Sequence, residues 1–115
     1  MIQKLHRLQQ GEVQQTLRYG VVIHSPSFLL RAHNTHSHTP PKCSVVVGKK
    51  VSKKATHRNR CKRVVREVFR GIIPTLKDGV FVVLVANPSL QSMSFQEIER
   101  ELHNKLQALS LVKQH

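Results

Sequence analysis

Acidic residues are scarce in this chain of 115 residues: six Asp and Glu stand against nineteen Lys and Arg, giving a formal net charge of +13. The acids are mostly isolated or share one helical face, so no pair of carboxylates is placed for two-metal hydrolysis. We therefore expect no protein catalytic residue. So large a positive charge makes the compact state repel itself, and a polyanion such as nucleic acid would relieve the repulsion.

Tryptophan is absent, and four Phe and one Tyr are the only aromatic residues, so the core must be mainly aliphatic. The two cysteines, Cys43 and Cys61, are too few for a disulfide framework. No apolar run approaches the ~20 residues of a membrane-spanning helix, and the first ten residues lack the apolar stretch of a signal peptide. These absences predict a cytoplasmic protein with no membrane partner, in a reducing compartment.

Ten of the nineteen Lys and Arg residues fall between Lys49 and Arg70, where Glu67 is the only acid. Apolar residues recur in this segment with the spacing of an amphipathic helix; they are Cys61, Val64, Val65, Val68, Phe69 and Ile72. At ~3.6 residues per turn, the opposite side holds Asn59, Arg63, Arg66 and Arg70, with Lys62 at its edge. A face that only kept the chain soluble would mix both signs of charge. The pattern therefore indicates a helix that buries one side and offers the other to an anion.

The remaining elements follow from periodicity and from turn residues. We expect helices at 12–19, 56–73 and about 94–111, strand pieces at 21–24, 28–31, 44–47 and 80–85, a polar loop at 33–42, and loose ends at 1–11 and 112–115. Gly20 and Pro74 end the first two helices, and Ser94 with Glu97 forms a capping box for the third. The apolar stripe of that third helix is Phe95, Ile98, Leu102, Leu106 and Leu109.

These elements predict one domain over residues 1–115, in the order α-β-β-α-β-α. Strands 44–47 and 80–85 flank the basic helix as a β-α-β unit and should pair in parallel. The fold class is α/β (α+β), a small two-layer sandwich of helices on a mixed sheet.

The basic segment resembles the RNR signature of the bacterial ribonuclease P protein family. The residues that match are Lys49-Lys50, Lys53-Lys54-Ala55, Arg58-Asn59-Arg60, Lys62-Arg63, Arg66-Glu67 and Phe69-Arg70. The resemblance extends over about 44–111 and is visible earlier at Leu5-His6-Arg7-Leu8 and Phe28-Leu29-Leu30. It implies the protein subunit of ribonuclease P, a ribonucleoprotein endonuclease that removes the 5′ leader of precursor tRNA. In this family a large RNA is the catalyst and holds the Mg²⁺, and no further protein partner is implied.

The resemblance also implies which residues bind RNA. The catalytic RNA would be bound by Arg58, Asn59, Arg60, Lys62, Arg63, Arg66 and Arg70, with Lys49, Lys50, Lys53 and Lys54 as auxiliary phosphate contacts. These residue types suit the role, because Arg binds phosphate through a planar fork and stays charged. The single-stranded leader would lie between the sheet and the first helix, at Val13, Leu17, Phe28 and Arg31. Family members typically place aromatic side chains there, so we expect this chain to rely more on charge than on base stacking.

Several alternatives remain open at this point. Phe28, Val13 and Leu17 are also good core residues. His33, His36 and His38, with Cys43 nearby, are residue types that bind zinc, but their spacing matches no structural zinc pattern, and we expect an exposed polar loop without metal. The alternative function is a general RNA-binding or ribosome-associated protein of similar fold with no role in tRNA cleavage.

Overall fold

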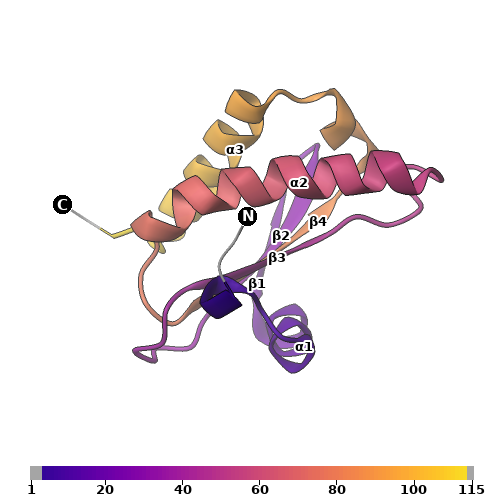
Figure 1. The fold of residues 1–115 in the computed structure, drawn as a ribbon. Helices are drawn as coiled ribbons and strands as arrows, with labels where there is room; N and C mark the ends of the chain where they lie inside the picture. The colour runs from indigo at the N-terminus through magenta and orange to yellow at the C-terminus, as the bar shows by residue number, and fades with distance from the viewer. Residues whose placement is uncertain (1–3, 114–115) are drawn as a thin grey trace.

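Three α-helices and four strands follow one another in the order α1-β1-β2-β3-α2-β4-α3 in the computed structural model, which describes residues 4–113 (Figure 1). The helices are α1 (Gln10–Tyr19), α2 (Ala55–Ile72) and α3 (Phe95–Ala108). The strands are β1 (Val21–His24), β2 (Phe28–Asn34), β3 (Lys42–Val46) and β4 (Val80–Ala86). Short 3-10 turns lie at Lys4–His6, Ile73–Thr75 and Pro88–Ser92. Each predicted helix and strand is present, with ends shifted by at most three residues.

The strands form one mixed sheet in the order β1-β2-β4-β3. β3 and β4 are parallel neighbours, as predicted, and the other two pairings are antiparallel. The two strand pieces around Pro26 are separate strands of a hairpin, in which Ile23 lies opposite Leu30. The sheet therefore has one strand more than the predicted six-element order. β2 also continues to Asn34, which shortens the predicted loop because this strand pairs with β4 along its whole length.

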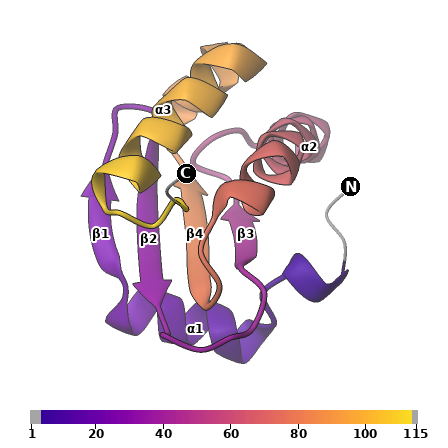
Figure 2. The same ribbon diagram turned by 90° about the vertical axis from the view of Figure 1, so that its left-hand side faces the viewer.

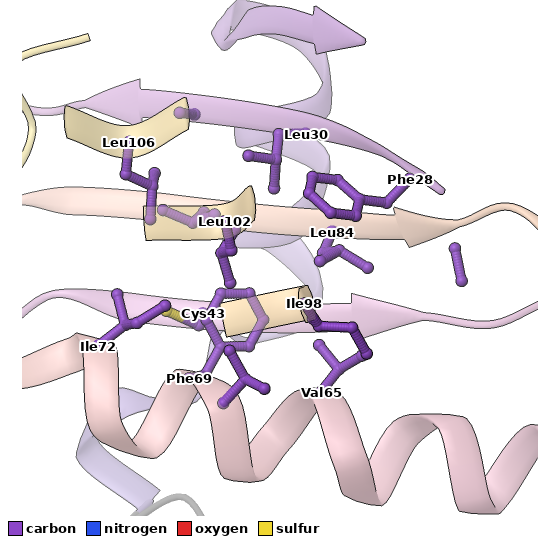
Figure 3. Packing of buried hydrophobic residues seen from close by; sticks show 14 of the residues in the cluster. Phe28, Leu30, Cys43, Val65, Phe69, Ile72, Leu84, Ile98, Leu102 and Leu106 are labelled. Carbon is purple, nitrogen blue, oxygen red and sulfur yellow. The ribbon is translucent and has the colours of Figure 1, made fainter. Parts of the chain in front are cut away.

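Helices α2 and α3 cover one face of the sheet, and α1 lies on the other side (Figures 1 and 2). The core fills the space under α2 and α3, and Phe69 of α2, Leu84 of β4 and Leu102 of α3 all belong to it (Figure 3). The predicted apolar stripe of α2 faces this core, and its members Cys61, Val65, Val68, Phe69 and Ile72 are buried. The predicted fold class, a mixed α+β sheet with packed helices, is confirmed.

The third helix begins with the predicted capping box. Ser94 Oγ accepts the backbone N–H of Glu97 at 3.2 Å, and the Glu97 carboxylate accepts the N–H of Ser94 at 3.0 Å. These bonds satisfy N–H groups that have no partner within the helix, and they lower the pKa of the Glu97 carboxyl. Phe95 does not join the buried stripe: it is 39% exposed, because it lies on the first turn, beyond the edge of the core.

The described parts of both chain ends, which the sequence predicts to be loose, contact the rest of the fold. Arg7 forms a β-bridge with Cys43, and α1 already begins at Gln10. Near the other end, Val112 bridges Leu76, and the N–H of Lys113 donates to the Thr75 carbonyl at 2.7 Å. The prediction for residues 1–3 and 114–115 lies outside the described residues.

Candidate nucleic-acid interface

The cationic residues of α2 lie on the side away from the core. Asn59, Arg60, Arg63, Arg66 and Arg70 are exposed, and Arg58 and Lys62 are half-buried. The helix takes this orientation because burying its apolar stripe removes that surface from water, whereas burying guanidinium groups without partners would be costly. We call the exposed side defined by Asn59, Arg63, Arg66 and Arg70, with Arg60 and Lys62 at its edges, the cationic face.

The acid on α2 neutralises little of this face. Glu67 Oε2 lies 3.6 Å from Arg70 Nη1, an exposed pair of the kind that contributes little to stability. Within residues 4–113, no hydrogen bond or ion pair engages the charged groups of Arg60, Lys62, Arg63 or Arg66. Four cations are therefore available to an external anion without breaking an internal contact.

Arg58 has a different role from its neighbours. Its Nη1 donates to the carbonyl of Ser52 at 3.0 Å and to that of Lys53 at 2.9 Å. The side chain thus ties the loop before α2 to the first turn of the helix. The sequence placed Arg58 among the RNA contacts and gave no sign of this structural role, since the bond depends on how the loop folds back.

The loop held by Arg58 presents the four predicted auxiliary lysines. Lys49, Lys50, Lys53 and Lys54 are all exposed. The loop is fixed beneath them, because Val51 is 6% exposed and its carbonyl accepts Gln91 Nε2 at 2.6 Å. The lysines therefore extend the positive surface from the cationic face past the start of α2.

The predicted leader residues do not all lie on one surface. Phe28 is fully buried among the core residues under α2 and α3, so its predicted contact with the leader is wrong and the core alternative is correct. Side chains alternate between the faces of a strand, and Arg31, three positions along β2, lies on the α1 side. Val13 is half-buried on α1, and Leu17 is 38% exposed there.

Beside α1, two rows of strand residues form a partly exposed floor on the sheet, which the sequence reasoning missed. The strand register aligns Arg31 with Val22, Val83 and Ser44, and aligns the next row as His24, Leu29, Val85 and Val46. Val22 and Val46 remain 38% and 40% exposed. The signal was present as alternation within each strand, but the neighbouring strands had to be known before the row could be assembled.

Arg31 is the cation of this floor. Its Nε is buried and has no hydrogen-bond partner in the described part of the chain. A buried donor without a partner is costly. The residue as a whole is half-buried, so an anion can approach its side chain from the α1 side of the sheet. The surface formed by Leu17, Arg31 and the row from His24 to Val46 is called here the sheet cleft.

Helix α1 is fixed at the border of the sheet cleft by an ion pair. Lys42 Nζ of β3 lies 2.8 Å from Glu12 Oε2, and the Gln9 N–H donates to Glu12 Oε1 at 2.8 Å. Partial burial raises the pKa of the Glu12 carboxyl, but the hydrogen bonds from Lys42 and Gln9, with the Lys42 charge, outweigh it and lower the pKa overall. At the other end of α1, a Cβ on Gly20 would lie 2.5 Å from the Thr16 carbonyl oxygen, so only glycine fits the turn into β1.

We expect acid to loosen α1 before the rest of the fold. Because the pKa of Glu12 is lower in the folded state, the pair stabilises the protein above the ordinary carboxyl pKa, and this contribution is lost as pH falls through the lowered value. NMR titration of the Glu12 carboxyl should give a pKa below that of an unfolded peptide, and Lys42→Met should raise it. Lys105→Met, which breaks the Lys105–Glu101 pair at 3.7 Å, is the matched control. A Glu12 pKa that Lys42→Met leaves unchanged would contradict the assignment.

The histidine-rich segment does not assemble a metal site in the described part of the chain. No group of three or more His, Cys, Asp and Glu side chains there could hold a metal ion. His33 instead lies beside Tyr19, with ring centroids 6.3 Å apart, and Cys43 is buried on the core side. Burial raises the pKa of the Cys43 thiol. Among the same residues, no helix is long and apolar enough to cross a membrane.

Comparisons with known proteins agree with this geometry. A family model described as Ribonuclease P matches residues 2–110. The ribonuclease P protein component of a Synechococcus species is 36% identical over 73 residues, which are 64% of this chain and 55% of that protein. The one from a Pseudanabaena species is 35% identical over 89 residues, or 77% of this chain and 73% of that protein.

Solved structures share the fold. The RNase P protein of Staphylococcus aureus superposes with a TM-score of 0.79 at 20% identity, covering 96% of this chain and all (100%) of that one. The RNase P protein of Thermotoga maritima gives a TM-score of 0.75 at 24% identity, covering 89% and 96%. The family model spans nearly the whole chain, including both helices that build the interface, and so this chain belongs to the ribonuclease P protein family.

Proposed function

We propose that this chain is the protein subunit of a ribonuclease P ribonucleoprotein, which removes the 5′ leader of precursor tRNA in the cytoplasm. Its cationic face binds the catalytic RNA, and its sheet cleft binds the single-stranded leader. Membership of the family supports the role. The observation that carries the proposal is the set of four cations on α2, Arg60, Lys62, Arg63 and Arg66, that have no internal partner among the described residues.

The cationic face suits a structured RNA because it offers positive charge for the phosphates and no side chains arranged to contact base edges. An A-form helix presents phosphates and 2′-hydroxyls, and proteins recognise it mainly by shape and backbone contacts. Guanidinium groups on successive turns of α2 can each neutralise a phosphate and release counterions. The exposed lysines of the preceding loop add contacts that position the RNA and do not specify its sequence.

The sheet cleft suits a flexible strand. Its apolar residues are aliphatic, so bases would gain contact area from them, and stacking would be limited to the ring of His24. Arg31 is only half-buried, so its guanidinium group would be the cation that meets a leader phosphate. The Mg²⁺ of the reaction would be held by the RNA. When bound, this metal ion would supply the activation of water for cleavage of the phosphodiester bond. This chain would contribute binding and orientation of the two RNAs.

The test is precursor-tRNA cleavage at low Mg²⁺, with a bacterial ribonuclease P RNA, with this protein, and with both. Stimulation that requires both components is the expected result. Cleavage by the protein alone would mean that it holds its own nuclease site. Salt-dependent RNA binding without stimulation, across several ribonuclease P RNAs, would favour a general RNA-binding protein.

Arg31 gives a prediction specific to the leader. Arg31→Met keeps the aliphatic stem and removes the guanidinium group, so the KM for a precursor with a leader should rise about tenfold, the loss of one charge-assisted contact. Affinity for the mature tRNA and for the catalytic RNA should stay unchanged. Arg100→Met on α3 removes the same group from an exposed site outside the cleft and should change neither value. Equal effects of Arg31→Met on precursor and mature tRNA would contradict a leader contact.

A further inference from the structure

A groove of about 550 Å³ separates α2 from the start of α3. Its floor is apolar and includes Val64, Leu90 and Ile98, and Gln91 and Ser94 border it from the segment before α3. The volume lies in the range of cavities that hold small molecules or single residues of a polymer, about 300–1,000 Å³. It is on the α2 side of the sheet, away from the sheet cleft.

Phe95 makes this groove unusual for the chain. Three of the four phenylalanines, Phe28, Phe69 and Phe81, are buried, whereas Phe95 lines the groove and is 39% exposed. Phe95 was predicted to belong to the buried stripe of α3 but lies outside it. The capping box at Ser94 fixes the first turn of α3, which carries this side chain. The groove therefore offers an aromatic ring to a ligand.

The rim of the groove is positive and continuous with the cationic face. His57, Arg60 and Arg63 line one side. Arg60 and Arg63 have no hydrogen bond or ion pair among the described residues, so both can reach a phosphate. Glu67 also lines the groove, as one acid beside the two arginines and His57, so the rim keeps an excess of positive charge. A nucleic acid bound at the cationic face would therefore lie next to a groove with an aromatic wall.

We propose that the groove between α2 and α3 binds one unpaired base of the catalytic RNA, stacked on Phe95, with its flanking phosphates at Arg60 and Arg63. This inference rests on the proposed function and deepens it, because it assigns sequence or structure selectivity to a region next to a non-specific surface. RNA is read mostly through bases that leave the helix and stack on aromatic or guanidinium groups. The combination of apolar floor, single ring and cationic rim matches a nucleotide better than an acidic peptide, which would leave its backbone amides unpaired on this floor.

The absence of tryptophan from the chain gives a direct probe. Phe95→Trp places a single fluorophore in the groove, and saturating ribonuclease P RNA should quench it, since a stacked base contacts the indole. Tyr19→Trp is the matched control, because Tyr19 is also exposed but lies on α1, on the other side of the sheet. Its emission should change little with RNA that carries no leader.

Affinity separates stacking from charge. Phe95→Ala should weaken binding to ribonuclease P RNA about tenfold, the loss expected for one base–aromatic stack, and should leave the slope of log K against log salt unchanged. Phe95→Tyr should retain affinity. Circular dichroism establishes that the variants are folded.

The outcomes distinguish this proposal from the function on which it rests. Wild-type affinity of a folded Phe95→Ala, or an unquenched Phe95→Trp in a bound complex, would overturn the base-binding groove and leave the subunit role intact. Quenching by an acidic amphipathic peptide but not by RNA would overturn it in favour of a protein partner. Absence of RNA binding by the unaltered chain would overturn both.

Discussion

Replacing Arg63 and Arg66 together by Gln will weaken binding to ribonuclease P RNA by at least about 100-fold, at two charge-assisted contacts of roughly 1.5–3 kcal/mol each. Both side chains are exposed and have no internal ion pair or hydrogen bond among the described residues. Their removal therefore costs the folded protein little and affects the complex directly. The slope of log K against log salt should become shallower by about 1.4–1.8, because each neutralised phosphate contributes roughly 0.7–0.9.

A matched-charge control makes this prediction sharp. Arg100→Gln with Lys113→Gln lowers the net charge by the same amount, at exposed positions outside the cationic face. If the net positive charge of the whole protein held the RNA, regardless of its position, both double variants would lose affinity equally. Affinity measured by filter binding over a salt series should instead separate them. Equal losses would show that the RNA is not bound at the face of α2.

Arg58 is a poorer choice for the same experiment, even though it belongs to the RNR signature. Its guanidinium group holds the carbonyls of Ser52 and Lys53. Arg58→Ala would free the loop that carries the lysines, and the loss of affinity would mix a lost charge with a moved loop. Arg63 and Arg66 change charge alone.

The fold was largely predictable because its strongest signals are local. The apolar spacing from Cys61 to Ile72 and the capping box at Ser94 fix two helices without reference to the rest of the chain. The run at 80–85 is apolar on every residue, as a strand covered on both faces must be, and β4 is central in the sheet. The separation of β1 and β2 was harder to foresee, because only the antiparallel pairing of the two strands shows that the chain reverses at Pro26.

The candidate site was predictable only where one element forms it. The cationic face lies on a single helix, so periodicity was enough to place Asn59, Arg63, Arg66 and Arg70 on one side. The floor of the sheet cleft comes from four strands. Because side chains alternate along β2, Phe28 points to the core and Arg31 points to the α1 side, where the leader would lie. The groove at Phe95 is built from two helices and the turn before α3. Its lining includes His57 and Met93, and no sequence pattern indicates that two residues so far apart in the chain lie on one groove.

Truncating Phe69 to Ala will have the largest effect on stability, about 3–5 kcal/mol, the usual loss for a buried phenylalanine. Phe69 is fully buried where α2, α3 and the sheet meet (Figure 3). A domain of this size is stable by only about 5–15 kcal/mol, so the variant should unfold at much lower urea concentration. Phe95→Ala removes the same atoms from a partly exposed site and should cost about 1 kcal/mol or less. Similar urea midpoints for the two variants would contradict the packing described for α2.

The Phe69→Ala variant also links the core to the interface. Its cations are all retained, yet α2 loses the contact that sets its orientation, so RNA affinity should fall together with stability. A ligand that binds only the folded state stabilises it by mass action, and excess ribonuclease P RNA should therefore raise the melting temperature of Phe69→Ala. The same RNA should raise that of the Arg63→Gln, Arg66→Gln variant far less, although its core is intact. A reversed order would mean that the RNA recognises something other than the face that Phe69 supports.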